Sequence, residues 1–567
     1  MDLNKKSIIY FFAAGLLASC SFLEPDLNAE RTEDQVWSDP DYAQGVLYSA
    51  YQKFGNSYTT YGSDFLDCAT DNAVTSRRDA ALIRMANGGW HPNANPIGDW
   101  SGSYDIIRNI NQFLNKGLDD VVYFRADHKR DSLYKVRLEG EAYFLRAFYN
   151  FNVLKRHGGK TADGRVMGGV IIDEHYTYED FLPRSTYEEC VENILFDLDK
   201  AVELLPEKYS GDDPDFGSGN IGHATSVAAQ ALRSQATLYA ASPAFYDVRS
   251  NISKAQAWQR AVEESQLFIE AIGSALPEGH EDLFWDVNQG ESVMHVWANN
   301  RNLENANYPP SLNGKGFTNP TQDLVDAFPM ANGLPIDHPH SGYSHNDPYA
   351  NRDPRLYATV MHNGMIFRDH EIETVEGGRD SETHHSMATR TGYYLRKFIN
   401  QNVNTTPGSA TNGARYFALF RKVEAYLNYA EAANELVGPN GVPPMGNLTA
   451  LEAINLVRSR SGISDETYSQ EVAAQGMDAF RAFIHNERRI ELAFENHRFY
   501  DLRRWAVGTE VLNKPATGVK IRLKPEGGFA YETFEVEARN YTDYMRYGPI
   551  PFRESLVGQE IEQNFGW

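Results

Sequence analysis

The chain has 567 residues and a formal net charge of -24, with 42% hydrophobic and 23% charged residues. This balance is typical of a globular protein with a sizeable core. The acidic excess argues against nucleic acid or anionic lipid as a partner, because both are bound through clustered Lys and Arg, and it is compatible with a neutral ligand.

The first twenty residues predict a secretory leader. Two lysines precede an apolar run over 8–18, which is shorter than the roughly 20 residues of a membrane-spanning helix. The run ends in Leu-Ala-Ser-Cys, which is similar to a bacterial lipobox. We therefore expect a signal peptide at 1–19, acylation of Cys20 and a polar tether over 20–35, which would hold the mature protein at a membrane surface outside the cytoplasm.

The rest of the chain contains few cysteines and no further long apolar run. Cys68 and Cys190 lie far apart and form no Cys-x-x-Cys pair, so we predict two free or buried thiols. No transmembrane helix is expected after the leader.

Helical periodicity dominates the first half of the mature chain. Asp39-Pro40 predicts an N-cap followed by the first residue of a helix. Apolar residues spaced three and four apart predict further helices over 132–157, from 185 or 186 to 205, over 225–239 and over 254–272. Helices of this length with small residues at their contacts are similar to tetratricopeptide units, which pair antiparallel helices.

From 286 to 415 the pattern changes to long loops rich in Asn, Gly, Pro and His. Short strands are predicted at 293–297 and 393–398, and the scattered aromatic residues favour ordered binding loops. Later elements are predicted as helices over 416–436, 451–461 and 478–505, a strand at 519–523 and an extended segment at 547–551. The predicted fold class is mainly α, with a tetratricopeptide-like scaffold, long irregular loops and a few short strands.

Three glutamates on the last predicted helix resemble catalytic groups in their spacing. Glu487, Glu491 and Glu495 lie four residues apart, and one interpretation is a carboxylate pair for glycoside hydrolysis. The other interpretation is a charged network that joins helices. Excess arginine keeps carboxylates ionised, whereas a general acid needs a raised pKa, so we favour the network. The surrounding arginines are Arg488, Arg489, Arg498, Arg503 and Arg504.

Two other motifs carry less weight. The segment 217–222 has the letters of a dinucleotide fingerprint but follows an Asp-rich stretch instead of a strand, so we predict a loop. His338, His340 and His345 match no known zinc-ligand spacing, and we predict a polar surface loop without a metal. Calcium bound by nearby carboxylates is the alternative.

Four stretches of the second half carry specific motifs. They read LVDAFPMANG at 324–333, RDPRL at 352–356, YLNYAEAANE at 426–435 and NERRIELAFENHRFYDLRRW at 486–505. RAFYNF at 146–151 and Gly-Gly-Val at 168–170 also fit. Together, and in this order, they resemble the SusD/RagB family of outer-membrane nutrient-binding lipoproteins over nearly the whole mature chain.

The resemblance implies both an architecture and a function. It implies a SusD-like helical region over 36–285 and a C-terminal region over 286–567, with binding loops at 286–415 and closing helices at 416–505. It also implies a surface-exposed lipoprotein of the outer membrane. Such a protein captures an oligosaccharide and delivers it to a TonB-dependent transporter of the SusC type, on which it sits as a lid. No enzymatic activity and no cofactor are implied. The alternatives are a peptide-binding member of the family and, with less support, a lipid-anchored glycosidase.

A site for a neutral sugar combines an aromatic platform with planar polar groups that satisfy the hydroxyls. In the starch-binding member of the family, a Trp and an Asn three residues later form part of the sugar site, after an Asp and an Arg. Trp90 and Asn93 match this spacing, and Asp67 or Asp71 and Arg77 are looser matches. The alternative for Trp90 is packing against the helical scaffold.

Further candidates lie outside this segment. The long loops contribute Tyr308, Arg368 and Tyr394. Asp41 lies near the mature N-terminus, where helix capping is the alternative. Trp297 falls in a predicted strand, and we expect it in the core.

Overall fold

The computed structural model describes residues 35, 37–55, 57–59, 61, 64–173, 182–273, 275–277, 284, 290–557 and 561–567. The predicted signal peptide, the lipidation site Cys20 and nearly all of the tether lie outside the described residues, so these remain predictions.

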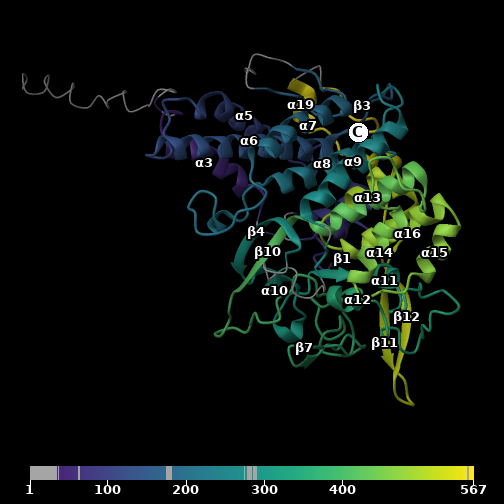
Figure 1. Cartoon of the computed structure of the whole chain (residues 1–567). Coiled ribbons are helices and arrows are strands. Elements are labelled where there is room, and N and C mark those ends of the chain that lie inside the picture. The colour runs from purple at the N-terminus through teal and green to yellow at the C-terminus, as the bar shows by residue number, and fades with distance from the viewer. Residues whose placement is uncertain are drawn as a thin grey trace, which may run out of the picture.

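The scaffold is a series of helices in which each packs against the next along the chain. In Figure 1, α5 to α9 form the upper layer, and α13, α14 and α16 continue it on one side. This arrangement confirms the prediction of a mainly helical, tetratricopeptide-like scaffold. The helices that build it are α3 (Pro40–Gln52), α5 (Trp100–Gln112), α6 (His128–His157), α7 (Tyr187–Leu204), α8 (Ser226–Ala241), α9 (Lys254–Ile272), α13 (Lys422–Val437), α14 (Ala450–Arg460), α15 (Thr467–Ala474), α16 (Met477–Glu491) and α17 (Arg498–Arg504).

Local capping explains why the predicted helix starts are close to the observed ones. The Asp39 carboxylate accepts a hydrogen bond from the Asp41 backbone at the start of α3, and a capping box between Thr186 and Glu189 opens α7. Close packing depends on small residues as well. A Cβ atom on Gly140 of α6 would lie 2.8 Å from the Leu205 side chain, so glycine allows α6 and α7 to approach closely.

The described strands form two-stranded antiparallel sheets, and the longer ones lie below the helices (Figure 1). The longer pairs are β4 (Ser292–Asn300) with β10 (Gly413–Arg421), and β11 (Ala516–Leu523) with β12 (Phe529–Glu537). The shorter pairs are β1 (Ala73–Thr75) with β5 (Thr318–Pro320), β2 (Gly159–Lys160) with β3 (Val166–Met167), β6 (Val360–Met361) with β9 (Tyr394–Leu395), and β7 (Ile366–Phe367) with β8 (His370–Glu371).

Three of the predicted elements were wrong in type or length, and two of them involve strands. The segment 416–421, predicted as the start of a helix, is part of strand β10, because it pairs with β4 across a long insertion. The strand predicted at 393–398 is reduced to the two residues of β9.

The helix predicted over 478–505 is broken into α16 and α17. Phe494 and Asn496, in the turn between them, have left-handed backbones with φ of 65° each. Both are anchored by an early segment: the Phe494 amide donates to Asp67 Oδ1 at 3.1 Å, and the Leu66 amide donates to Asn496 Oδ1 at 3.3 Å. Contacts with residues more than 400 positions away therefore end α16.

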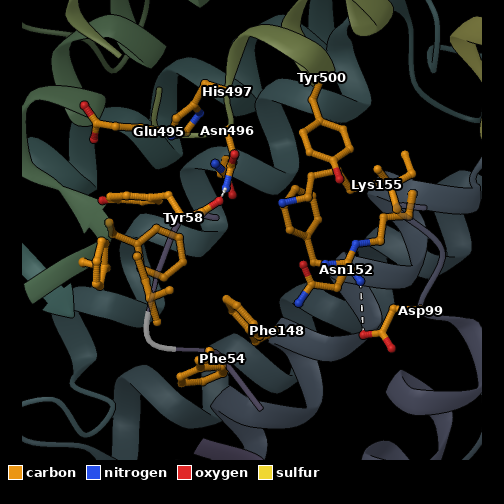
Figure 2. A pocket seen from close by; sticks show the side chains of 18 of the residues that line it. Phe54, Tyr58, Asp99, Phe148, Asn152, Lys155, Glu495, Asn496, His497 and Tyr500 are labelled. Atoms are coloured by element: carbon orange, nitrogen blue, oxygen red, sulfur yellow. Dashed lines mark hydrogen bonds and ion pairs between the residues drawn. The ribbon is translucent and has the colours of Figure 1, made fainter. Parts of the chain in front are cut away.

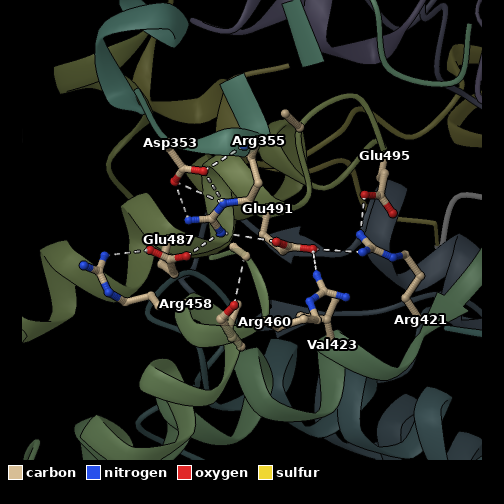
Figure 3. Close-up of polar contacts among 12 residues, drawn as sticks. Asp353, Arg355, Arg421, Val423, Arg458, Arg460, Glu487, Glu491 and Glu495 are labelled. Atoms are coloured by element: carbon tan, nitrogen blue, oxygen red, sulfur yellow. Dashed lines mark hydrogen bonds and ion pairs between the residues drawn. The ribbon is translucent and has the colours of Figure 1, made fainter. Parts of the chain in front are cut away.

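Glu491, the last residue of α16, lies at the centre of a buried ion-pair cluster (Figure 3). Its carboxylate contacts Arg355 at 3.2 Å, Arg421 at 2.8 Å and also Arg460. All four side chains are at most 2% exposed. A buried charge without a partner is strongly unfavourable, so these contacts hold α12 (Pro354–Thr359), β10 and α14 together.

The rest of the cluster is paired in the same way. Glu487 contacts Arg355 and Arg458, while Glu495 accepts from Lys397 at 2.8 Å. Five acidic and five basic side chains share the site: Glu291, Asp353, Glu487, Glu491, Glu495, Arg355, Lys397, Arg421, Arg458 and Arg460. The interpretation of the three glutamates as a structural network is confirmed.

The membership of the network differs from the prediction, because the arginines next to the glutamates in sequence bind other groups. Arg488 and Arg504 contact Asp501, Arg489 and Arg498 contact Asp71, and Arg503 stacks on Phe499. Because the helix stops at Glu491, the spacing of four residues does not continue to Glu495.

The first prediction concerns this cluster. Glu491→Gln should lower the free energy of unfolding by about 3–5 kcal/mol, because it leaves buried guanidinium groups without compensation. Urea denaturation measures the change. Glu203→Gln is the control, since Glu203 makes an exposed ion pair with Lys200 and its loss should cost less than about 1 kcal/mol. Equal, small changes in both variants would contradict a structural role for the cluster.

Candidate ligand-binding site

A cavity of about 380 Å³ opens between the C-terminal half of α6 and the turn that follows α16 (Figure 2). Residues 53–55, 57, 58 and 61, the loop at 96–99 and the β4–β10 sheet complete its wall. Among the side chains that line it are Phe54, Tyr58, Asp99, Phe148, Asn152, Lys155, Arg156, Glu424, Glu495, Asn496, His497 and Tyr500. A cavity of this size that mixes aromatic and polar side chains is suited to a small organic ligand.

One side of the cavity is aromatic. Phe54 and Phe148 pack edge to face with ring centroids 4.7 Å apart, and both rings are only partly buried. Tyr58 is held by a 2.7 Å hydrogen bond from its hydroxyl to the Ala418 carbonyl. These rings give the cavity apolar faces of fixed orientation.

The wall that continues from Phe148 is polar and is built on the last turns of α6. Phe148, Asn152 and Lys155 follow one another at helical spacing and therefore share a face. The Asn152 amide makes no hydrogen bond to any described residue, whereas Arg156 contacts Asp99 at 3.1 Å. Asn152 is thus available to a ligand.

Burial changes the charges around the cavity. It raises the pKa of Glu424 to about 7 and, together with Arg156, lowers the pKa of Lys155 to about 7. Burial and the nearby Arg488 also lower the pKa of His497 well below its ordinary value, so this imidazole is neutral at physiological pH.

A second feature lies on the other face of the strand that lines the cavity. Val296 and Phe417 are opposite each other in the β4–β10 register and line the cavity, so Trp297 and its partner Tyr416 point the other way. Trp297 is 56% exposed and shares its face with exposed Asn299. The strand was predicted correctly, but the prediction of Trp297 in the core was wrong.

Trp90, the predicted stacking residue, lies in the core and is 4% exposed. Its ring packs edge to face on Trp567, with centroids 5.0 Å apart, and on Phe499. The indole N–H donates to Asn95 at 2.9 Å. This burial contradicts the expectation of an open ring face, and the alternative, packing against the scaffold, is what the structure shows. Asn93 is exposed in the adjacent turn.

The predicted acidic candidates are structural contacts. Asp67 is 1% exposed and accepts from Asn72 at 2.8 Å. Burial would raise the pKa of Asp71, but Arg489 and Arg498 lower it far below its ordinary value. Asp71 therefore ties the early segment to α16 and α17.

Arg77, the basic member of the predicted set, contacts Asp64 at 3.2 Å and lies over the Phe317 ring. Asp41 is exposed in the first turn of α3, and its backbone N–H donates to the cap residue Asp39. Neither residue lines the cavity.

Of the three candidates from the long loops, only Tyr308 and Arg368 are shown in contact with each other. Tyr308 is fully buried, and its hydroxyl donates to the Asn400 and Val403 carbonyls at 2.9 Å each. Arg368 lies over the Tyr308 ring at 5.5 Å. Tyr394 is also fully buried and donates to the Asp380 carbonyl. None of these residues lines the cavity.

The cavity residues were not predicted, because they lie on helices whose apolar periodicity indicates a structural scaffold. The sequence contained one signal for them. The polar residues Asn152 and Lys155 follow Phe148 on the same helix face. Their position across the cavity from Glu495 and His497 has no local signature in the sequence.

The predictions of a loop at 217–222 and of free or buried thiols agree with the structure. The segment 217–222 forms a loop with one short turn at Ser218–Asn220. Cys68 and Cys190 are free and buried. Within the described part of the chain, no group of His, Cys, Asp and Glu is arranged to hold a metal. No helix in that part is both long and apolar enough to cross a bilayer.

Comparisons with known proteins give consistent matches. A family model described as the SusD family matches residues 283–567, and one described as starch-binding associating with outer membrane matches residues 23–238. SusD-like protein P25 of Formosa agariphila is 34% identical over 535 residues, which cover 89% of this chain and 90% of that protein.

Two crystal structures from Bacteroides fragilis are similar over almost their full length. A SusD-like protein has a TM-score of 0.73 at 26% identity and covers 94% of this chain and 99% of its own. A SusD-like carbohydrate binding protein has a TM-score of 0.71 at 20% identity and covers 93% of this chain and all of its own. The fold of the chain is therefore SusD-like.

The second prediction concerns Glu424. The folded state holds its proton up to about pH 7, whereas the unfolded state releases it near pH 4.5, so Glu424 favours the folded state below pH 4.5 and loses this contribution as the pH rises through 7. The free energy of unfolding of Glu424→Gln, relative to the native protein, should increase by about 3 kcal/mol between pH 4.5 and 8. Urea denaturation at several pH values measures it, and a constant difference would contradict the assignment.

Proposed function

The chain belongs to the SusD/RagB family, and on this premise we propose that it captures an oligosaccharide outside the cell and delivers it to a TonB-dependent transporter of the SusC type, on which it acts as a lid. The observation that carries the proposal is the cavity beside α6. There, partly exposed aromatic rings lie near the Asn152 amide and the Lys155 ammonium, which make no hydrogen bond or ion pair with a described residue.

The chemistry of the cavity suits a sugar. The C–H faces of a pyranose bury apolar area against rings such as Phe54 and Phe148. The Asn152 amide offers a donor and an acceptor in one plane, which match two neighbouring hydroxyls. A similar fold in a Bacteroides fragilis protein described as carbohydrate binding adds support.

Trp297 and Asn299 form a second proposed contact surface, which a longer oligosaccharide would reach. An exposed indole on a strand presents a rigid flat face, and Asn299 two residues later is on the same side of the sheet. Because Val296 of the same strand lines the cavity, we propose that the strand contacts two parts of one oligosaccharide. We propose Trp297 as a stacking residue in place of Trp90.

The proposed location is the outer surface of the outer membrane, with the protein anchored through an acylated Cys20. Two observations support this: the leader ends in a lipobox-like sequence, and one matching family model is described as associating with the outer membrane. Copurification with the transporter, and its loss in a Cys20→Ser variant, would test the partner and the anchor together.

We propose binding without turnover. The carboxylates of α16 are engaged by buried arginine side chains, so they offer no free acid and base pair. A released-sugar assay on the purified protein tests this, and any turnover would contradict the proposal. Titration calorimetry against polysaccharides and peptides tests the ligand class, and binding of peptides alone would favour the peptide-binding alternative.

The third prediction concerns Trp297. Trp297→Ala should weaken binding of a recognised polysaccharide about tenfold, because an exposed aromatic platform is removed without loss of core packing. Calorimetry or an affinity gel measures the change. Tyr48→Ala is the matched control, since Tyr48 is 59% exposed on α3, and it should leave affinity unchanged. Equal affinities for all three proteins would exclude Trp297 from the site.

A further inference from the structure

Lys155 is the unusual group of the cavity. Its Nζ lies 4.8 Å from the centre of the Tyr500 ring and 5.5 Å from that of Phe151. It makes no ion pair or hydrogen bond with any residue that the structure describes. Figure 2 shows Lys155 on the same side of the cavity as Tyr500, opposite Tyr58 and Glu495.

Two other donors near Lys155 lack a hydrogen bond of good geometry. Tyr500 lines the cavity and is 6% exposed, and its hydroxyl interacts with the neighbouring Tyr61 and Arg156 side chains without forming a well-aligned hydrogen bond to either. The Nε of Arg156 is buried without a hydrogen-bond partner. Buried donors are almost always satisfied, so the unpaired Lys155 ammonium beside these two donors indicates a place for an acceptor that the chain itself does not supply.

The nearby carboxylates are committed to other groups. Asp99 contacts Arg156, and Asp501 contacts Arg488 and Arg504. Glu495 accepts from Lys397 and Arg421, at 2.8 and 2.7 Å. Glu424 accepts the Arg421 backbone N–H, and burial raises its pKa to about 7. The Lys155 ammonium is therefore left without a counter-ion of its own.

A purely structural role for Lys155 is the competing explanation. Lys155 lies in the last turn of α6, where the helix dipole and free carbonyl groups favour a cation. That role accounts for a positive charge at this end of the helix. It does not account for the Tyr500 hydroxyl and the Arg156 Nε at the same wall, neither of which has a hydrogen bond of good geometry.

We propose that this wall of the cavity is a subsite for a sugar with an anionic substituent, a carboxylate or a sulfate ester, whose oxygens are bound by Lys155 and Tyr500. The inference rests on the proposed function and specifies its ligand class. A charge-assisted hydrogen bond in a cavity shielded from water is stronger and more selective than a contact with a neutral hydroxyl. The acidic net charge of the chain does not oppose it, because recognition depends on the local donors.

The subsite also predicts a direction for the pH dependence. Burial and Arg156 lower the pKa of Lys155 to about 7, so the ammonium is lost above this pH and affinity for an anion should fall between pH 6 and 9. Glu424 loses its proton over the same range, which also disfavours an anion. Asp99 and His497 line the cavity on other elements, and the more distant Asp501 acts on Lys155 through its charge. Lys155→Arg separates the two titrations, because arginine stays charged.

The fourth prediction uses matched pairs of polymers. Binding of the full-length protein is measured to polygalacturonate and its methyl ester, to carrageenan and its desulfated form, and to neutral laminarin, starch and galactan. We expect at least one charged polymer to bind tenfold or more tightly than its neutralised counterpart. The pair of polygalacturonate and its methyl ester tests for binding of a carboxylate, and the carrageenan pair tests for binding of a sulfate ester.

Substitutions link this preference to the cavity. Lys155→Gln should abolish it, Tyr500→Phe should reduce it, and Lys155→Arg should retain it at pH 6 and weaken its decline toward pH 9. Lys129→Gln, at an exposed position in the first turn of α6, is the control and should change nothing. Circular dichroism confirms that each variant is folded.

The outcomes separate this inference from the proposed function. Binding confined to neutral polymers, or a charged preference that survives in Lys155→Gln, would overturn the anionic subsite and leave glycan capture standing. Binding to no polysaccharide would contradict the proposed function, and the subsite with it.

Discussion

The structure depends on one buried carboxylate. Glu491 ends α16 and contacts three guanidinium groups, from α12, the end of β10 and the end of α14. In an interior of low polarity, separating these charges is far less favourable than at a surface, so the contact is cooperative: each partner is stable only while the others are present. The equal number of acidic and basic groups keeps the cluster close to neutral. Irregular loops are thereby fixed to a helical scaffold without extensive sheet or disulfide support.

The same cluster shapes the candidate site. Because α16 stops at Glu491, the chain turns through Phe494 and Asn496 and brings Glu495 and His497 to the cavity wall. One oxygen of Glu495 is already shared by Lys397 and Arg421, so this wall is rigid. The facing wall is different, since Asn152 and Lys155 of α6 and Tyr500 of α17 have donors without a well-aligned hydrogen bond to a described residue. The cavity therefore has one wall of paired, rigidly held groups and one wall with donors that are open to a ligand.

The fold of this chain and its ligand site depend on different features of the sequence. Solved structures with 20–26% identity share its fold over nearly their whole length, because the helical scaffold requires only apolar periodicity and small residues at contacts. Ligand contacts require particular groups at particular places. The Trp90 segment illustrates the difference: the spacing to Asn93 matches a sugar site, yet the C-terminal Trp567 packs against the indole and closes it.

The sequence by itself determined the elements whose causes are local. The capping box at Thr186 and the span of α9 follow from neighbouring residues, and the arginine-rich surroundings of Glu487 and Glu491 indicated an ion-pair network before its geometry was seen. Only the tertiary structure decided that 416–421 is a strand, that the last long helix is broken, and that Trp297 is exposed while Trp90 is buried. Strand pairing, left-handed turns and ring burial are each set by partners more than a hundred residues distant, whose positions no local pattern encodes.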